Sequence, residues 1–519
     1  MKELVYHRHL LPAVERVPDK VGFIDGDYRG TFATHLDRTL RLSSALGSEL
    51  GLGRSDRFAV MATNSHEYLE LYHAAYLGAG IVNPLNLRLA PKELAFILGD
   101  SGTKVCFVDA LFAPAIDAIR AEVGLEKVVL IGPDSGVPHD ITYDDLIASG
   151  EAVVPDEPEE DDPVVLMYTG GTTGLPKGVL LDQRAEILNL YHVAMTVGLD
   201  ESSIYLHQTP MFHAASMAGM LGLPASGGVS VFIPLFDPGK VLELIEEHKV
   251  NWTTMVPTMI GMVVAHPDFK PERLASLSQL TYGASPMPGA LLDQLLGTFP
   301  DMEISQGYGM TESSSVLTFL MPEEHRRGGD VLRSAGRPMP GVVLSIQDAD
   351  GNPVPKGEPG EVCARAGNFM REYWKRPEET AAAFAGGWYH TGDMGYLDEG
   401  GYLYLVDRVK DMIVTGGENV YSSEVENAVA KHPAVAQVAV IGIPSEQWGE
   451  AVHAIVVPKP GASVTEKEIV EHVREWIAGY KVPKSVEIRS EPLPLSGAMK
   501  VLKRDLRAPY WEGRGRAVN

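Results

Sequence analysis

The sequence predicts an α/β protein. We expect a large N-terminal domain of helix-covered, mainly parallel sheets with a small β-barrel unit, followed by a small, mobile α+β domain. Strand-like and helix-like segments alternate up to about residue 305, which is typical of a mainly parallel sheet covered by helices. From about 333 to 407 short strands and turns replace this alternation, and a charged junction follows. We therefore divide the chain into residues 1–408 and residues 409–519.

The first run of alternating elements ends near residue 150. Short apolar runs predict strands at residues 58–62, 105–108 and 128–131. Helical spacing predicts helices at residues 67–77 and 91–98. An acidic stretch with several prolines at 151–163 then predicts a solvated connection on the surface.

A glycine-rich loop between two apolar runs follows this connection. Glycines present backbone N–H groups without Cβ interference, and hydroxyls and a lysine add anion-binding donors. In the mononucleotide P-loop the lysine precedes Ser or Thr and opens a helix, whereas here Gly178 follows Lys177 and Pro176 opposes a helix. The loop predicts a phosphate cradle, with a tight turn between strands as the alternative. Its members are Thr169, Gly170, Gly171, Thr172, Thr173, Gly174 and Lys177.

The alternation is cleanest between residues 229 and 305. Asp237 and Pro238 form an N-cap and first-turn pair that opens a helix. In sheets of this kind, ligands bind beyond the carboxyl ends of the strands. Two strings rich in small and polar residues stand there, at 283–285 and 306–312, and both are site candidates. The strands are expected at 229–233, 252–256, 279–282 and 302–305, and the helices at 238–247, 258–265 and 288–298.

The C-terminal part begins after the charged residues 407–411. Ser423 with Glu426, and Thr465 with Glu468, have the spacing of capping boxes that open helices. Strand-like runs at 435–442, 451–458 and 484–490 complete a small α+β unit.

Composition restricts the class of partner. A net charge of −25 argues against non-specific binding to nucleic acid or to anionic lipid. The two cysteines, Cys106 and Cys363, lack a metal-ligand spacing in the sequence and are expected to be inert buried thiols. With no signal-like apolar core and no run long enough to span a membrane, we expect a cytoplasmic protein without a transmembrane segment.

Five strings in order along the chain resemble the signatures of the adenylate-forming (AMP-binding) superfamily, in its acyl-CoA synthetase or fatty-acid–CoA ligase branch. They are the glycine-rich loop, YGMTE at 308–312, YHTGD at 389–393, DRVKD at 407–411 and the region of Lys500. Two positions depart from the pattern. Gly170 replaces a usual serine, and Met499 replaces a usual glycine before the lysine.

The resemblance implies that ATP activates a carboxylic acid as acyl-AMP with release of pyrophosphate, and that coenzyme A then displaces AMP. A carboxylate aimed at a phosphate site makes chemical sense when Mg²⁺ lies between them, which points to Glu312. The resemblance implies that Thr311 contacts phosphate and that Lys500 is the catalytic lysine. Lys503 is the alternative candidate for the catalytic lysine. The implied cofactor-binding residues are Gly283, Ala284, Ser285, Tyr308, Gly309, Asp393 and Arg408 for the nucleotide, and Gly416 and Gly417 in a loop that moves towards the acyl-adenylate and opens a path for the thiol.

The acid is less well defined by the sequence. His213 matches a position that lines the acyl channel in relatives, and a buried structural histidine is the alternative. We expect Gly307 and Gly309 to leave room beside the channel, which favours a medium- or long-chain fatty acid over an aryl or sterol-derived acid. Loading of a carrier protein, and nucleotide binding without catalysis, remain alternatives. A homodimer is also retained, and Lys410 is expected to be the pivot of a mobile C-terminal lid.

Overall fold

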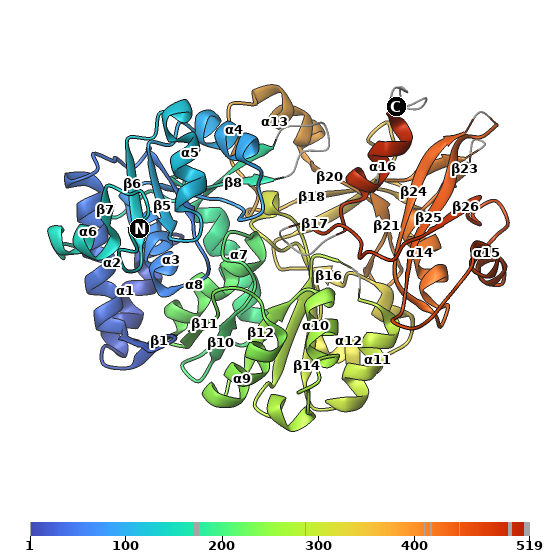
Figure 1. The fold of residues 1–519 in the computed structure, drawn as a ribbon, viewed down its shortest axis with the longest axis horizontal. Coiled ribbons are helices and arrows are strands. Elements are labelled where there is room, and N and C mark those ends of the chain that lie inside the picture. Colours follow the sequence, from blue (N-terminus) through green and yellow to red (C-terminus); the bar gives the residue numbers. More distant parts are fainter. Residues whose placement is uncertain are drawn as a thin grey trace. The chain divides into compact units, whose positions relative to one another are not determined.

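The chain forms two compact units (Figure 1). The computed structural model describes residues 2–169, 176–285, 287–408, 411–415, 418–445, 447–496 and 501–512, and the side chains of 407, 408, 418 and 419 lie outside this description. The first unit comprises Met1–Leu332, Gly336–Val342 and Ala366–Ala382. The second comprises Arg333–Ala335, Val343–Arg365 and Ala383–Asn519. The expected boundary at 408/409 differs from this division and stays a prediction.

An eight-stranded sheet organises one half of the first unit. Its order is β19-β9-β8-β4-β3-β5-β6-β7, with parallel pairing from β8 to β7 and antiparallel pairing of β9 with both its neighbours. The strands are β3 (Arg57–Met61), β4 (Ile81–Pro84), β5 (Val105–Asp109), β6 (Lys127–Ile131), β7 (Ile141–Thr142), β8 (Pro163–Thr169), β9 (Lys177–Asp182) and β19 (Glu372–Tyr373).

The other half of the first unit contains a nine-stranded sheet. Its order is β16-β15-β14-β13-β12-β10-β11-β1-β2, parallel in the middle and antiparallel at both ends. The strands are β1 (Val21–Asp25), β2 (Tyr28–Thr31), β10 (Ile204–His207), β11 (Val229–Phe232), β12 (Trp252–Met255), β13 (Gln279–Gly283), β14 (Glu303–Tyr308), β15 (Thr318–Leu320) and β16 (Arg337–Pro338).

Helices bury the apolar residues of these sheets. Against the eight-stranded sheet, for example, Leu94, Leu98 and Ile116 pack on Cys106 and Val108. The helices are α1 (His7–Arg16), α2 (Phe32–Ser48), α3 (His66–Ala74), α4 (Pro91–Ser101), α5 (Ala113–Val123), α6 (Tyr143–Ser149), α7 (Gln183–Val197), α8 (Met217–Ser226), α9 (Pro238–His248), α10 (Pro257–Val264), α11 (Gly289–Thr298), α12 (Pro322–Arg327) and α13 (Pro377–Ala383). A π-helical turn, η1 (Ala75–Ala79), directly follows α3. Among the described residues, no helix combines the length and the apolar character needed to cross a membrane.

The second unit contains two smaller sheets. An antiparallel half-barrel of order β17-β18-β20-β21 takes the place of the expected barrel unit. A five-stranded sheet, β23-β22-β25-β24 with β26 beside β25, is covered by α14 and α15 through Val440 and Val452, and by α16 through Ala439 and Ile441. The elements are β17 (Val343–Gln347), β18 (Gly360–Arg365), β20 (Tyr389–Leu397), β21 (Leu403–Arg408), β22 (Ile413–Thr415), β23 (Glu418–Val420), α14 (Ser422–Ala430), β24 (Val435–Ser445), β25 (Gly449–Pro458), α15 (Glu466–Arg474), β26 (Ser485–Ile488) and α16 (Lys503–Trp511).

The expected fold class is confirmed, with two local corrections. The strand expected to end at residue 305 continues to Tyr308, and it is not the last of its sheet because β15 and β16 follow. The capping box at Ser423 is wrong, since α14 has Tyr421 as its N-cap and the Ser423 hydroxyl donates instead to the Val406 carbonyl. Its partner Glu426 accepts the Val440 N–H at 2.8 Å. The box at Thr465 and Glu468 is confirmed.

Buried histidines link the helices of the first unit. Nε2 of His35 on α2 lies 2.7 Å from Nδ1 of His73 on α3, and the Tyr6 hydroxyl lies 3.2 Å from Nε2 of His73. His207 on β10 stacks on Phe232, with ring centroids 4.7 Å apart. Burial lowers the pKa of His73 to about 4 and that of His207 to about 3. These rings are therefore neutral in the folded protein at neutral pH.

Acid should destabilise the first unit through these histidines. The unfolded chain takes up protons below the ordinary histidine pKa of 6.5, whereas folded His73 and His207 do not until about pH 4 and 3. Stability should therefore fall as the pH is lowered from 6.5, by about 2 kcal/mol per histidine at pH 5. Urea unfolding of the first unit across this range measures the slope, and His207→Leu should make it shallower. Phe232→Leu removes packing without removing a titrating group, so a change of slope in that variant as well would contradict the explanation.

Candidate active site

The flanks of the glycine-rich loop form an antiparallel pair. Thr169 ends β8 and is paired with Lys177 at the start of β9. Lys177 thus opens a strand and not a helix, which agrees with the exclusion of a mononucleotide P-loop. The loop residues between them, Gly170, Gly171, Thr172, Thr173 and Gly174, lie outside the described residues.

Lys177 is held by two residues from a later part of the chain. Its ammonium forms an ion pair with the carboxylate of Glu379 on α13. The same ammonium lies 5.2 Å from the centre of the Tyr373 ring, within the range of a cation–π contact. The predicted phosphate-binding lysine therefore already has a fixed direction, set by an anion and an aromatic face.

Tyr373 connects this lysine to the predicted metal ligand. Tyr373 belongs to β19, which pairs with β9 in the register Tyr373↔Val179, and the adjacent Trp374 N–H donates to the Gly178 carbonyl at 2.7 Å. The Tyr373 hydroxyl donates to Oε1 of Glu312 at 2.9 Å. The structure therefore brings Lys177 to the ring and Glu312 to the hydroxyl of one tyrosine side chain.

The turn that carries Glu312 is fixed through its backbone. Thr311 and Glu312 lie in the short 3-10 turn η4 (Thr311–Ser313), and the Met370 N–H donates to the Glu312 carbonyl at 2.7 Å. The Asn368 side-chain amide donates to the carbonyl of Ser313 at 2.8 Å and to that of Val316 at 2.7 Å. Asn368 and Met370 thus fix the backbone of the turn.

The two candidate strings at the strand ends lie side by side. Gly283 and Gly307 are paired neighbours in β13 and β14, and a Cβ on Gly283 would lie 2.5 Å from the Gly307 carbonyl oxygen. Ala284 has a φ of 66°, a left-handed backbone that is rare for a residue with a Cβ. Ser285 follows it, and Tyr308 is the last residue of β14, so residues 306–308 belong to the strand and not to the loop after it.

Gly309 does not border the open room that the sequence predicts for an acyl channel. In the structure a Cβ at Gly309 would lie 2.1 Å from the Ser315 carbonyl oxygen, so the glycine permits a close approach of two backbone segments. A Cβ on Gly307 would meet the Phe319 ring at 3.3 Å. Neither position is open space.

His213 lies at the N-terminus of another short turn, η2 (Ala214–Ser216). Its Nδ1 accepts the Ala215 N–H at 3.3 Å, and its carbonyl accepts the Ser216 hydroxyl at 2.7 Å. The residue is half-buried, so it keeps a partly exposed face as well as a structural contact.

The predicted ribose-binding residues belong to the second unit. Asp393 on β20 is 9% exposed, is paired in register with Arg408 of β21, and donates its N–H to Oγ1 of Thr391 at 3.1 Å. The side chain of Arg408 lies outside the described residues, as do Gly416, Gly417, Lys410 and Lys500. The fallback Lys503 lies 2.7 Å from Glu426 and donates to the Ser422 hydroxyl at 2.6 Å, so it is engaged within its own unit.

Two residues that contact the predicted site were missed from the sequence. Tyr373 and Glu379 both lie in the string REYWKRPEET at 371–380. An aromatic and acidic string directly before a predicted helix is a weak signal. Only the pairing of β19 with β9 shows which residues it meets.

A buried carboxyl group lies close to the turn that carries Glu312. Glu186 on α7 is fully buried, and within the described residues neither of its oxygens has a hydrogen-bond partner. Burial raises its pKa to about 8; the Asp182 carboxylate adds to the shift, and the nearby hydroxyls of Tyr76 and Ser314 oppose it. Tyr72, also buried, is the other titratable group that faces it. Glu186 is therefore mostly protonated at neutral pH and lies close to the hydroxyl of Ser314, the residue that follows η4.

Comparisons with known proteins agree with the predicted signatures. A family model described as "AMP-binding enzyme" matches residues 11–374, and one described as "AMP-binding enzyme C-terminal domain" matches residues 424–500. A fatty acid–acyl-carrier-protein ligase of Streptomyces coeruleorubidus is 34% identical over 484 residues, covering 92% of this chain and 91% of its own. A feruloyl-CoA synthase of an Amycolatopsis species is 36% identical over 488 residues, covering 92% and 94%. The solved structure of a Mycobacterium tuberculosis fatty acyl-CoA synthetase matches with a TM-score of 0.77, 34% identity and 99% coverage of both chains.

Replacing Glu186 by glutamine should stabilise the first unit at alkaline pH. The folded pKa of about 8 exceeds the ordinary glutamate value of 4.5, so stability is full below pH 4.5 and falls as the pH rises towards 8. The loss approaches about 1.4 kcal/mol per pH unit in that window. Glu186→Gln removes the titrating group, so the melting temperatures of variant and parent should diverge from pH 5 to pH 9. Glu243→Gln, at an exposed position of α9, is the matched control, and parallel curves for Glu186→Gln and the parent would refute the assignment.

Proposed function

The chain belongs to the AMP-binding enzyme family and is an ATP-dependent, AMP-forming acid–CoA ligase, and we propose from this premise that its acid is a fatty acid of medium or longer chain. The observation that carries the proposed ATP-binding site is the Lys177–Tyr373–Glu312 arrangement, which brings a cation and an oxygen ligand together beside the glycine-rich loop. Such an arrangement suits a polyphosphate, whose negative charge needs both direct cations and a bridging metal.

Glu312 and Thr311 offer the donor set that Mg²⁺ prefers. A carboxylate, a hydroxyl and phosphate oxygens are hard oxygen ligands, and magnesium usually binds one or two carboxylates together with phosphates and water. The hydrogen bond from Tyr373 fixes the direction of the Glu312 carboxylate. When bound, the ion would neutralise phosphate charge, and this chain's part is to orient the ligand oxygens.

Lys177 is proposed to bind phosphate after exchanging its partner. Its ion pair with Glu379 keeps the ammonium beside the Tyr373 ring until an anionic ligand competes for it.

Within the same unit, Gly283, Ala284, Ser285 and Tyr308 are proposed to hold the adenine, because they lie at adjacent strand ends. The loop residues 170–174, which lie outside the described part of the chain, remain part of the proposed cradle.

The residues of the second unit complete the proposal. Asp393 is proposed to accept hydrogen bonds from the ribose hydroxyls, with Arg408 as a second contact and Gly416 and Gly417 near the nucleotide. Lys500 is proposed to stabilise the negative charge that develops when the acid attacks the α-phosphate. We further propose that residues 409–519 move as a lid about Lys410, because one site must serve two different half-reactions.

The fatty-acid assignment rests on the surroundings of His213 and on the relatives. Met211, Phe212 and Met217, next to His213 in the chain, are buried apolar residues and suit an alkyl chain. The Streptomyces coeruleorubidus relative and the Mycobacterium tuberculosis structure both carry fatty acid in their names. An aryl acid is the second candidate, favoured by the feruloyl-CoA synthase relative.

Three further elements of the proposal concern partners and location. A carrier protein is the alternative acceptor to coenzyme A, because one relative at 34% identity is an acyl-carrier-protein ligase. Cys106 and Cys363 are free, buried thiols, which suits a reducing compartment. We therefore propose a cytoplasmic location. We also propose a homodimer, which a measurement of the molecular mass in solution can test.

An acid panel tests the substrate and the acceptor together. With Mg-ATP, fatty acids of increasing chain length should release pyrophosphate, with the highest kcat/KM at medium or long chains. Coenzyme A should then release AMP faster than a phosphopantetheinylated carrier protein does. An optimum at acetate or at a cinnamic acid would overturn the fatty-acid assignment, and faster turnover with the carrier would overturn the acceptor.

Two lysine variants test the proposed catalytic role at the C-terminus. Lys500→Ala should lower the rate of acyl-AMP formation by about 10²–10³-fold, the usual cost of losing one donor to developing charge. Thioester formation from supplied acyl-AMP should change little, since the lysine acts only in the first half-reaction. Lys503→Ala is the matched control and should affect stability more than either half-reaction, because Lys503 pairs with Glu426. The opposite pattern would show that the two roles were exchanged.

A further inference from the structure

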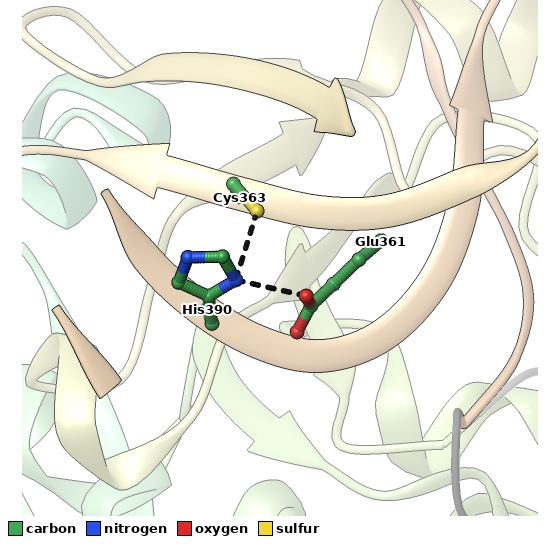
Figure 2. Close-up of side chains that lie close together, drawn as sticks. All are labelled: Glu361, Cys363 and His390. Carbon is green, nitrogen blue, oxygen red and sulfur yellow. Dashed lines mark hydrogen bonds and ion pairs between the residues drawn. The ribbon is translucent and has the colours of Figure 1, made fainter. Parts of the chain in front are cut away.

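Three metal-ligand side chains converge in the half-barrel of the second unit, outside the proposed magnesium site. Figure 2 shows Glu361 and Cys363 of β18 beside His390 of β20. Nδ1 of His390 lies 3.5 Å from Sγ of Cys363 and 2.8 Å from Oε2 of Glu361. One ligand atom from each residue lies within 4.8 Å of the other two. The cluster joins a thiol, an imidazole and a carboxylate.

The backbone explains why these side chains meet. Glu361 and Cys363 are two residues apart on one strand, so both point to the same face of the sheet. His390 is the cross-strand partner of Cys363, whereas Glu361 pairs with Met394. Two steps along β18 therefore correspond to four along β20, and the extra residues form an irregularity within β20 next to Asp393. No metal-ligand spacing is visible in the sequence because the third ligand arrives across the sheet.

His390 is held in an orientation suited to a metal ion. Its second ring nitrogen, Nε2, lies 3.3 Å from the Ala385 carbonyl oxygen, to which an N–H can donate. A histidine that ligates a metal through one nitrogen typically donates the other N–H to such an oxygen, which fixes the ring and its tautomer. Metal binding displaces the proton that Nδ1 shares with the Glu361 carboxylate at 2.8 Å, and the N–H at Nε2 is kept, so the lone pair of Nδ1 then points towards Cys363 and Glu361.

The spacing of the ligand atoms is close to that of a tetrahedral site. Zinc binds sulfur at about 2.3 Å and nitrogen or oxygen at about 2.0–2.2 Å, so neighbouring ligands lie about 3.3–3.8 Å apart. The separation of Sγ and Nδ1 already has this value, and the contact between Nδ1 and the carboxylate must widen by about half an ångström. Glu361 can supply this by a small rotation of its side chain, and water would fill the fourth position.

We propose that Glu361, Cys363 and His390 form a binding site for a thiophilic divalent cation of the zinc type. The mixed sulfur, nitrogen and oxygen donors select such an ion over Mg²⁺, which prefers oxygen ligands alone. On binding, the Cys363 thiol and Nδ1 of His390 release their protons to solvent, and the sulfur forms a bond to the ion. Nδ1 of His390 and the ionised Glu361 supply the other two electron pairs, and no group changes oxidation state.

A second group of metal-binding side chains provides an internal contrast. Asp25, His66 and Glu67 also lie close together in the first unit, with Nδ1 of His66 2.9 Å from Asp25 and 3.2 Å from Glu67. This group contains no sulfur. A signal that depends on sulfur therefore distinguishes the two clusters.

Cobalt binding to the full chain tests the proposal. Chelator-treated, reduced protein is titrated with Co²⁺ without thiol reagents, and the near-ultraviolet band of thiolate-to-cobalt charge transfer is recorded. We expect the band to saturate at one equivalent and to disappear when Zn²⁺ is added. The chain has only two cysteines, so Cys363→Ser should abolish the band and Cys106→Ser, the matched control, should retain it.

Further variants keep the outcome decisive if Cys363→Ser is unstable. Glu361→Gln keeps an oxygen that can accept the Gly392 N–H, now 3.1 Å from Oε1, and should weaken cobalt binding by at least about tenfold. Circular dichroism and melting of each variant establish that it is folded. The proposal is overturned if folded parent protein gives no sulfur band with excess Co²⁺, if cobalt binds without that band, or if the band follows Cys106.

Discussion

The candidate site depends on the pairing of β19 with β9. This short antiparallel contact places Tyr373 so that its ring faces Lys177 and its hydroxyl donates to Glu312 at 2.9 Å. The lysine follows the glycine-rich loop and the glutamate follows β14, in the other sheet of the unit. One tyrosine therefore links the two sheets at the point where their ligand-binding ends are expected. Removing its hydroxyl would leave the Glu312 carboxylate with one less constraint on its direction, while the ring would still face Lys177.

Most of the fold was predictable because periodicity and caps are local properties. The strands and helices between residues 229 and 298, and the Asp237 cap, follow from apolar spacing and from residues next to each other in the chain. The capping box at Ser423 failed because tertiary contacts took both of its side chains, one to Val406 and one to Val440. The end of β14 was misplaced because Gly307 and Tyr308 gain strand partners, from β13 and β15 for the glycine and from β15 for the tyrosine.

The candidate site was predictable only where a motif is contiguous. Thr311, Glu312 and Asp393 stand in recognisable strings, whereas Tyr373 and Glu379 act on residues about 60 to 200 positions away. The same limit applies to Glu361 and His390, which meet across a sheet. The glycines show a related limit. Gly309 was predicted to border empty space, yet its missing Cβ is needed because the Ser315 carbonyl occupies that position.

The division of the chain into units has a consequence for the order in which they can be completed during synthesis. The first unit consists of Met1–Leu332, Gly336–Val342 and Ala366–Ala382, so its last piece leaves the ribosome after β17 and β18 of the second unit. A nascent chain ending near residue 342 would expose the edge of β9 and lack Asn368, Met370 and Tyr373, which hold the Glu312 turn. Unpaired edges of this kind invite association with other chains. While β17 and β18 of the second unit are being synthesised, the eight-stranded sheet of the first unit still lacks β19. During this interval the nascent chain is exposed to aggregation or to binding by a chaperone.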